Sequence, residues 1–248
     1  MENMLEIDQL NYSYHTPEGE TAVLDRISFS IKSGEFLSIV GPSGCGKSTL
    51  LSLICGLIQP EKGSVFLKGK NTGYMLQKVQ LLEWRSIYKN VILGLEIQHK
   101  LSPEMKKKAH NLLTLYGLHD FANSKPSELS GGMRQRAALI RTLMSDPDLL
   151  LLDEPFSALD YQTRLNVNDE IGQIIKKEHK TAILVTHDLS EAISLGDKVL
   201  ILSKRPSTIK QTVLLEFPEK ENTPLKRRNT PEFKEYFNLI WKEMNKND

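Results

Sequence analysis

Features that place a chain outside the cell, across a membrane or on nucleic acid are scarce in this sequence. It contains only two cysteines, Cys45 and Cys55, too few for a disulfide framework, which indicates a cytosolic setting with reduced thiols. The uncharged run Ser48–Pro60 is shorter than the roughly 18 apolar residues that a membrane-spanning helix needs. Acidic residues within Glu2–Asp8 interrupt the N-terminus, so we expect no signal peptide. The net charge of +1 gives no electrostatic footprint for nucleic acid.

The composition is that of an ordinary globular protein. Hydrophobic residues make up 40% of the 248 residues and charged residues 25%, which suits one large α/β domain or two small ones. Short apolar runs alternate with segments of helical periodicity along much of the chain. Because strands separated by helices of this length form parallel sheets covered on both faces, we expect an α/β fold.

The glycine-rich segment Gly41–Thr49 fits the pattern G-x-x-x-x-G-K-[ST] of a phosphate-binding loop. The apolar run Phe36–Val40 before it predicts a buried strand, and a helix is expected to continue to Ile54. Glycines let such a loop curl tightly and bring its N–H groups toward phosphate oxygens, while the positive end of the helix dipole faces the same anion. Lys47 is expected to reach the β- and γ-phosphates, and Ser48 to hold Mg²⁺. In this context a plain glycine-rich turn is disfavoured.

A second motif ends a fully apolar strand. Leu149–Leu152 is followed by Asp153 and Glu154, an arrangement that suits nucleotide hydrolysis. We expect Asp153 to bind Mg²⁺ directly or through water, and Glu154 to activate the attacking water. Alone, these acids would fit a strand that ends in solvent at least as well. A phosphate loop in the same chain favours the catalytic interpretation.

The segment Leu129–Arg136 is the third chemical signal. Ser130 can cap a helix that runs to about Met144, and Gly131 and Gly132 leave the N-terminus of that helix bare for an anion. A capped helix with a flexible first turn would explain the segment if it stood alone. Since the chain already has one phosphate loop, a second phosphate-binding helix end makes sense if it serves the nucleotide of another chain.

The remaining elements follow from periodicity and turn residues. Ser102 and Pro103 predict the start of a helix whose apolar stripe extends to Tyr116. The tail Pro231–Met244 is expected to be an amphipathic helix that packs Phe233, Phe237, Ile240 and Trp241 on the domain. The other predicted segments are a loop through Pro17 and Gly19, strands Met4–Leu10, Ile27–Ile31, Ser64–Lys68, Gly73–Leu76, Thr181–Val185, Lys198–Leu202 and Thr208–Phe217, a polar helical region from Val79 to Ser130, and a helix Tyr161–Glu178.

Taken together, the motifs resemble the ATP-binding cassette (ABC) ATPase family. The matching segments, in the order and spacing of that family, are Gly41–Thr49, Gln77, Leu129–Met133, Leu149–Pro155, Ser157–Asp160 and His187. The resemblance covers nearly the whole chain. It implies a P-loop NTPase (RecA-like) core with an antiparallel β subdomain and an inserted α-helical subdomain. Within one domain spanning residues 1–248, the core would comprise 1–77 and 137–217, the helical subdomain 78–136, and a C-terminal helical tail 218–248.

The resemblance implies a head-to-tail homodimer that sandwiches two ATP molecules, each between the phosphate loop of one subunit and the Ser130 helix of the other. The implied nucleotide contacts are Tyr14, Gly41, Pro42, Ser43, Gly44, Cys45, Gly46, Lys47, Ser48, Thr49, Gln77, Ser130, Gly131, Gly132 and Asp160. The implied catalytic residues are Lys47, Gln77, Glu154 and His187, and the implied Mg²⁺ ligands are Ser48, Gln77 and Asp153. The Cys45 side chain needs no role of its own.

Four of these residues take their roles from the resemblance alone. Gln77 would link the Mg²⁺ site to the helical subdomain, and Asp160 would lie at the subunit interface. His187 would contact the γ-phosphate as a switch, rather than simply end a strand as an ordinary histidine. Tyr14 matches the aromatic residue that stacks on adenine, with Tyr12 as the competing assignment.

The type of cassette follows from what accompanies it. A phosphate loop alone would also fit a P-loop kinase or a GTPase, but neither needs Leu129–Met133 or His187. A lone cassette resembles the separate ATPase subunit of a bacterial importer, peripheral at the cytoplasmic face of the cell membrane. Its implied partners are two membrane-spanning permease subunits and a solute-binding protein, with no nucleic acid. A soluble dimeric ABC switch protein that does not serve transport is the alternative.

The segment Gln80–Val91 is similar to the Leu-Leu-Pro-Trp-Arg region of the nitrate/sulfonate/taurine importer family. That similarity predicts a small oxyanion as the transported solute. Glu83 replaces the usual proline, and the connection from Gly69 to Gly73 is short, so an importer of a thiamine precursor stays open as an alternative. Trp84 is expected either to contact the membrane subunits or to be part of the helical core.

Overall fold

The computed structural model describes residues 2–69, 71–77, 80–157, 159–218 and 223–246. Val79, where the polar helical region was expected to begin, and Ala158, within the motif Ser157–Asp160, lie outside these residues. None of the described helices combines the length and the apolar character needed to cross a membrane.

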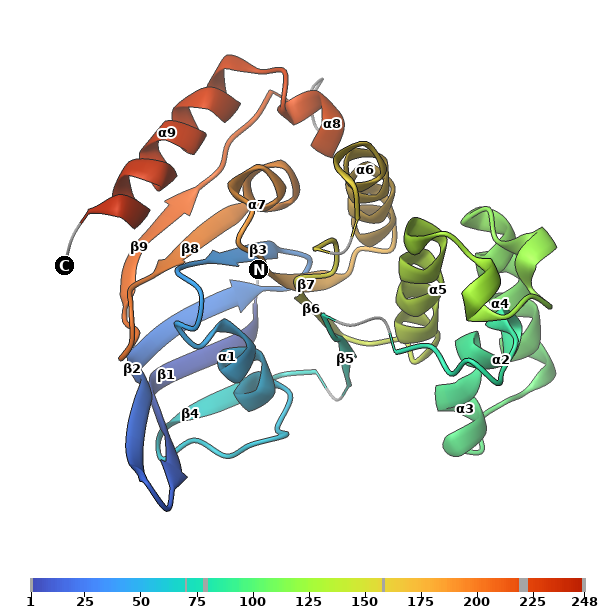
Figure 1. Cartoon of the computed structure of the whole chain (residues 1–248), viewed down its shortest axis with the longest axis horizontal. Coiled ribbons are helices and arrows are strands. Elements are labelled where there is room, and N and C mark those ends of the chain that lie inside the picture. The colour runs from blue at the N-terminus through green and yellow to red at the C-terminus, as the bar shows by residue number, and fades with distance from the viewer. Residues whose placement is uncertain (1, 70, 78–79, 158, 219–222, 247–248) are drawn as a thin grey trace.

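A six-stranded sheet forms the centre of the molecule (Figure 1). Its order is β5 (Thr72–Met75), β6 (Leu149–Asp153), β7 (Thr181–Val185), β3 (Phe36–Val40), β8 (Lys198–Leu202) and β9 (Ile209–Leu214). All neighbouring strands pair in parallel except β8 and β9, which are antiparallel. The parallel sheet expected from the apolar runs is therefore confirmed, with an antiparallel strand added at one edge.

A second, antiparallel sheet lies beside the first and has the order β2 (Gly19–Lys32), β1 (Asn3–Thr16) and β4 (Lys62–Leu67). The sequence predicted short strands here, whereas β1 and β2 each extend over 14 residues and are joined only by a turn at Pro17 and Glu18. Gln9 and Arg26 have left-handed backbone conformations where the register shifts. Such bulges interrupt the alternation of apolar and polar residues, which hides one long strand as two short ones.

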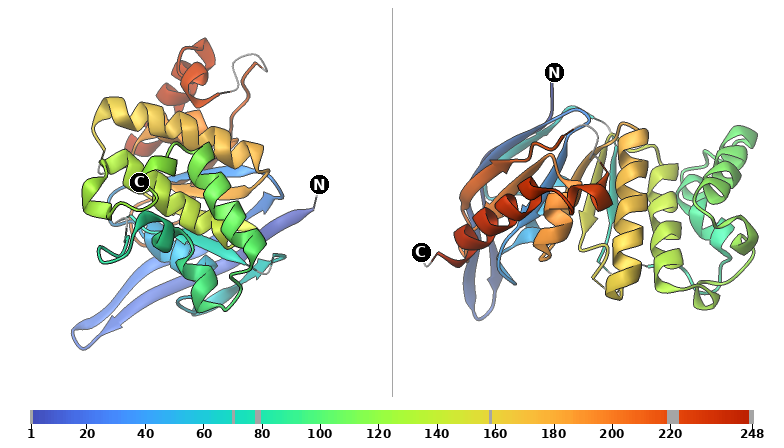
Figure 2. Two further views of the ribbon diagram at one scale, coloured as in Figure 1. Left: turned by 90° about the vertical axis from the view of Figure 1, so that its right-hand side faces the viewer. Right: turned by 90° about the horizontal axis from the view of Figure 1, so that it is seen from above.

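Helices α2 (Ile87–Val91), α3 (Leu93–Ile97) and α4 (Pro103–Leu115) form an arm at one end of the molecule, with short 3-10 turns at His119–Phe121 and Pro126–Glu128. The side chain of Ser102 caps α4 as expected, accepting a hydrogen bond from the Met105 N–H. Helix α5 (Gly131–Met144) packs against the arm on one side and against α6 (Tyr161–Lys177) and β5 on the other. Figure 2 shows these helices as successive layers beside the sheet.

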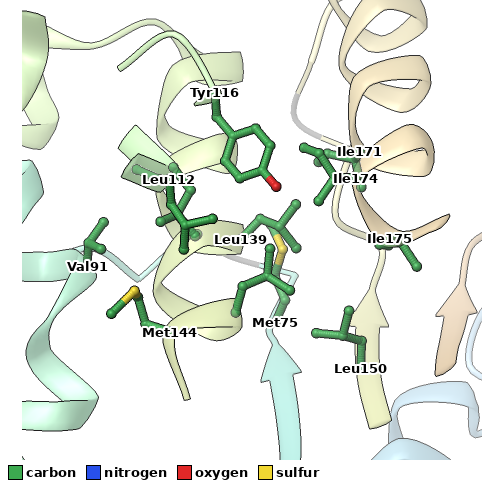
Figure 3. Close-up of a cluster of buried hydrophobic side chains, with 14 of the residues drawn as sticks. Met75, Val91, Leu112, Tyr116, Leu139, Met144, Leu150, Ile171, Ile174 and Ile175 are labelled. Carbon is green, nitrogen blue, oxygen red and sulfur yellow. The ribbon is translucent and has the colours of Figure 1, made fainter. Parts of the chain in front are cut away.

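Apolar side chains form separate clusters on the two faces of the central sheet. Leu149 and Leu151 of β6 face α1 (Lys47–Ile54) and the antiparallel sheet, while Leu150 and Leu152 face α5 and α6. All four leucines are at most 1% exposed, which explains why this strand is apolar at every position. Figure 3 shows the second cluster, in which side chains from the arm, β5, β6 and α6 converge on α5.

The C-terminal region comprises α7 (Leu189–Leu195), α8 (Pro224–Arg227) and α9 (Pro231–Asn245). Ile240 of α9 is fully buried against α7, β8 and β9, and Phe233 and Phe237 pack around it, as predicted. The prediction for Trp241 is wrong, because its side chain is 56% exposed. Its ring lies at the edge of the stripe, stacked on Phe237 with the ring centres 6.3 Å apart.

Candidate nucleotide site

The phosphate loop joins the end of β3 to the start of α1. Gly46, the residue before α1, has φ +106°, a conformation that L side chains rarely adopt, and a Cβ there would collide with Val23. The ammonium group of Lys47 is buried and donates hydrogen bonds to the carbonyl oxygens of Gly41 (2.9 Å) and Pro42 (3.0 Å). A cation is therefore held inside the loop, as binding of a polyphosphate requires.

Asp153, the last residue of β6, lies directly beneath the loop and is buried. The Ser48 hydroxyl donates to its Oδ1 (3.1 Å), and the Tyr74 hydroxyl donates to its Oδ2 (3.3 Å). Burial raises the pKa of Asp153 above its ordinary value, and the two hydrogen bonds oppose that shift. A hydroxyl and a carboxylate side by side form a set of hard oxygen donors that fits Mg²⁺.

Glu154 follows Asp153 and turns its side chain toward the mouth of the loop. Its backbone has φ +43°, and its N–H donates to the carbonyl oxygen of Val185 (2.8 Å). One carboxylate oxygen, Oε2, accepts a hydrogen bond from Gln77 Nε2 (2.9 Å) and lies 3.2 Å from His187 Nδ1. Three residues expected to be catalytic, far apart in sequence, thus meet at a single oxygen atom.

These groups surround a cavity of about 640 Å³. Ten of the predicted site residues line it: Tyr14, Ser43, Gly44, Gly46, Lys47, Ser48, Thr49, Gln77, Glu154 and His187. Gly41, Pro42, Cys45 and Asp153 lie behind this lining, and the Cys45 side chain is buried in the core with its pKa raised by burial. A larger cavity of about 930 Å³ lies between the end of α4 and α6, but none of the motif residues is among the described residues that line it.

Tyr14 and Tyr12 occupy different environments. Tyr14 is 43% exposed at the cavity wall, and its hydroxyl lies 3.1 Å from Thr49 Oγ1. Tyr12 packs against the apolar cluster around α1 and meets the Tyr14 ring edge-on, with the centres 5.1 Å apart. Of the two residues, Tyr14 is the one with a ring face available at the cavity.

The second phosphate-binding motif lies elsewhere in the chain. Ser130 caps α5 by accepting a hydrogen bond from the Met133 N–H (3.3 Å), and Asp160 caps α6 by accepting one from the Thr163 N–H (3.0 Å). A Cβ on Gly131 would come within 3.0 Å of Leu159, and a Cβ on Gly132 within 3.1 Å of side chains on α6. The glycines therefore permit close packing of the two helix starts. Ser130, Gly131, Gly132 and Asp160 are not part of the cavity lining within this chain.

Two residues line the cavity without having been expected from the sequence. Val23 of β2 and Arg205, which follows β8, both belong to segments that carry no motif. Tyr74 of β5, which donates to Asp153, was also missed. Only the fold brings these side chains to the site, so no local pattern signals them.

Comparisons with known proteins identify relatives along most of the chain. Residues 24–157 match the family model described as ABC transporter. The "Uncharacterized ABC transporter ATP-binding protein YtlC" of Bacillus subtilis is 45% identical, covering 98% of this chain and 96% of its own. A taurine import ATP-binding protein of Pelagibacter ubique is 37% identical (94% and 93% covered), as is a nitrate import ATP-binding protein of Synechocystis sp. (95% and 93%).

A solved structure agrees with these relatives. It is a dimeric ATP-binding cassette in a post-hydrolysis state, bound to ADP and Pi. Its sequence is 30% identical, its TM-score is 0.75, and the match covers 87% of this chain and all of that one.

Proposed function

Because the chain belongs to the ABC transporter family and is an ABC-type ATPase, we propose that it is the ATP-hydrolysing subunit of an importer of a small oxyanion, such as taurine, another sulfonate or nitrate. The observation that carries the catalytic part is the meeting of Gln77, Glu154 and His187 at the mouth of the phosphate-loop cavity. The solute is proposed from relatives named for taurine and nitrate import.

In the proposed reaction, water attacks the γ-phosphorus of ATP, and the bond from that phosphorus to the β,γ-bridging oxygen breaks to give ADP and Pi. The Glu154 carboxylate accepts the proton of the attacking water, and His187 contacts the γ-phosphate beside it. Lys47 exchanges its hydrogen bonds with the Gly41 and Pro42 carbonyl oxygens for contacts with the β- and γ-phosphates. Tyr14 stacks on the adenine.

Ser48, Asp153 and Gln77 are the residues that would hold Mg²⁺. The hydroxyl of Ser48 already lies against the Asp153 carboxylate, and Gln77 adds an amide oxygen from the opposite side of the cavity mouth. When bound, Mg²⁺ supplies positive charge against the developing charge on the phosphate oxygens. Gln77 also begins the segment that leads into the helical arm.

Ser130 and Asp160 are proposed to act on the nucleotide of a second copy of the chain in a head-to-tail homodimer. Both are exposed and near each other at the starts of α5 and α6, but outside the cavity of their own chain. A helix N-terminus at this distance from its own phosphate loop suits an anion brought by a partner. The dimeric cassette bound to ADP and Pi supports this arrangement.

The remaining proposed partners are two permease subunits, which place the ATPase at the cytoplasmic face of the membrane as a peripheral subunit, and a solute-binding protein. Trp84 is 74% exposed, so the alternative that it belongs to the helical core is wrong. Glu83, which stands where the similar family has proline, accepts a hydrogen bond from the Ser127 N–H (3.1 Å). The segment around Trp84 is thereby fixed to the arm and presents an aromatic side chain for contact with a permease.

A pull-down tests the proposed function. A tagged Glu154→Gln subunit is incubated with detergent-solubilised native membranes and Mg-ATP, and the retained proteins are identified. The expected result is a polytopic permease in equal amount, which also leads to its solute-binding protein. That protein is then titrated with taurine, other sulfonates, nitrate and pyrimidine precursors of thiamine. Recovery of an ATP-bound dimer alone would contradict the transport role, and tight binding of a pyrimidine would contradict the oxyanion assignment.

A further inference from the structure

The turn between β8 and β9 is fastened to the phosphate loop by a buried serine. Ser207 is fully buried, and its hydroxyl donates a hydrogen bond to the carbonyl oxygen of Cys45 within the loop. Its backbone N–H donates to the Val23 carbonyl oxygen (2.8 Å), and its own carbonyl oxygen accepts from the Asp25 N–H (2.9 Å). The turn is therefore held from the loop on one side and from β2 on the other.

The turn is also closed internally. The Ser203 N–H donates to the Thr208 carbonyl oxygen (3.0 Å), and the Thr208 N–H donates to Ser203 Oγ (2.9 Å). These bonds leave a short excursion whose position relative to the phosphate loop is fixed. Backbone hydrogen bonds of this kind position a side chain more precisely than a free surface loop does.

Arg205 lies in this excursion and reaches over the phosphate loop. A Cβ built on Gly44, in the middle of the loop, would lie 3.2 Å from a terminal nitrogen of the Arg205 guanidinium. Arg205 lines the same cavity as Ser43, Gly44 and Lys47. Within the described part of the chain, Arg205 is exposed and makes no ion pair with a carboxylate.

We propose that Arg205 contacts the phosphate chain of the bound nucleotide, as a second cation opposite Lys47. The inference rests on the proposed nucleotide site but assigns a residue outside every motif of the sequence. Guanidinium presents several N–H donors in one plane and binds phosphate oxygens bidentately. Its position beside Gly44 favours phosphate over adenine, because loop N–H groups at that position define where phosphate oxygens lie.

The experiment compares nucleotides of different phosphate content. Dissociation constants for ATP, ADP and AMP are measured by calorimetry in wild type, Arg205→Gln and Arg205→Lys. Loss of the contact should weaken ATP and ADP binding about tenfold, at the lower end for a charge-assisted hydrogen bond because Arg205 is exposed, and leave AMP binding within twofold. The lysine variant should recover part of the loss, and the effect in Arg205→Gln should shrink at high salt.

Lys204→Gln is the matched control, since Lys204 is the neighbouring exposed cation but does not line the cavity. It should bind all three nucleotides as the wild type does. Unchanged ATP binding by Arg205→Gln would overturn the proposal, as would an equal loss for AMP, which would indicate contact with the base or ribose. If the wild type itself bound no ATP, the proposed function would fail instead. Melting curves establish that each variant is folded.

Discussion

Glu154 combines an unusual backbone with the central position in the site. A non-glycine residue at φ +43° carries a conformational cost on the order of 1–3 kcal/mol. The Val185 carbonyl oxygen accepts the Glu154 N–H and helps to hold that conformation, which directs the carboxylate toward Gln77 and His187. The strain is thus spent at the place where the proton of the attacking water must be accepted.

Replacing Glu154 with glutamine should reduce ATP turnover by about 10²- to 10⁴-fold, the usual contribution of a general base, because the amide cannot accept the proton. ATP affinity should change little, since Lys47 and the loop N–H groups are untouched. Phosphate release and ATP calorimetry measure the two quantities. Glu178→Gln, which removes an exposed carboxylate at the end of α6, is the control and should hydrolyse normally. Turnover near wild type in Glu154→Gln would remove Glu154 from its proposed role.

Glu191 makes stability depend on pH. It is buried, accepts a hydrogen bond from Thr186 Oγ1 (2.6 Å) and lies 3.8 Å from Arg164 Nε, and burial raises its pKa from 4.5 to about 7. Asp188 reinforces the shift, and Arg164 and His187 oppose it. Between pH 4.5 and 7 the folded chain therefore binds more protons at this site than the unfolded chain does, so stability falls as pH rises through that range.

Glu191→Gln should remove this dependence. At pH 8 the variant is expected to unfold at higher denaturant than the wild type, by up to on the order of 3 kcal/mol from 1.4 kcal/mol per pKa unit. At pH 5 the advantage should largely vanish, because the wild-type carboxyl is then protonated when folded. Urea titrations at the two pH values provide the measurement, and a difference independent of pH would show that Glu191 is charged in the fold.

At the level of elements, the start of α5 provides the sharpest test of the dimer. Ser130→Arg places a bulky cation where the partner's nucleotide is proposed to bind, and should abolish ATP-dependent dimerisation on gel filtration. It also removes a helix cap, at a cost of about 1 kcal/mol. Ser102→Arg removes an equivalent cap from α4, with the same 3.3 Å hydrogen bond. The control should lose similar stability and still dimerise; an ATP-driven dimer of Ser130→Arg would exclude Ser130 from the interface.

The elements that the sequence predicted well are those with one dominant physical signal. The bounds of β3 and β7 match the expected strands, because both are uninterrupted apolar runs buried on two faces. The helix at Pro103 matches because a capping serine and a proline mark its start. Where bulges at Gln9 and Arg26 break the alternation, the long strands were missed.

The site divides in the same way. Its phosphate loop and the Asp153–Glu154 pair lie in continuous motifs and could be found without a structure. Arg205 and Tyr74 could not, because each reaches the site through strand order in the sheet rather than through nearby sequence. Trp84 was left between core and surface by the sequence, since an aromatic residue among helical residues fits either, and only its exposure decides.

At the level of the whole molecule, Trp84 tests how the ATPase meets the membrane. Because the side chain is 74% exposed, Trp84→Ala should leave the melting temperature nearly unchanged but weaken co-purification with the permease several-fold. Trp241→Ala is the matched control, since Trp241 is also exposed but lies on α9, in a different part of the molecule from the arm. Its co-purification should equal that of the wild type. A large loss of stability, or equal weakening in both variants, would exclude a specific contact at Trp84.

Helix α5 has a consequence for the mechanics of the molecule. Its 14 residues give a stiff rod about 21 Å long. One end begins at Ser130, and near the other end Arg141 donates a hydrogen bond to the carbonyl oxygen of Gln80 (2.5 Å), in the segment that leads to Trp84. A push on that segment is therefore delivered to the Ser130 end as a displacement of the whole rod. Such a part works as a lever, and its stroke is set by how far α5 can slide between the arm and α6.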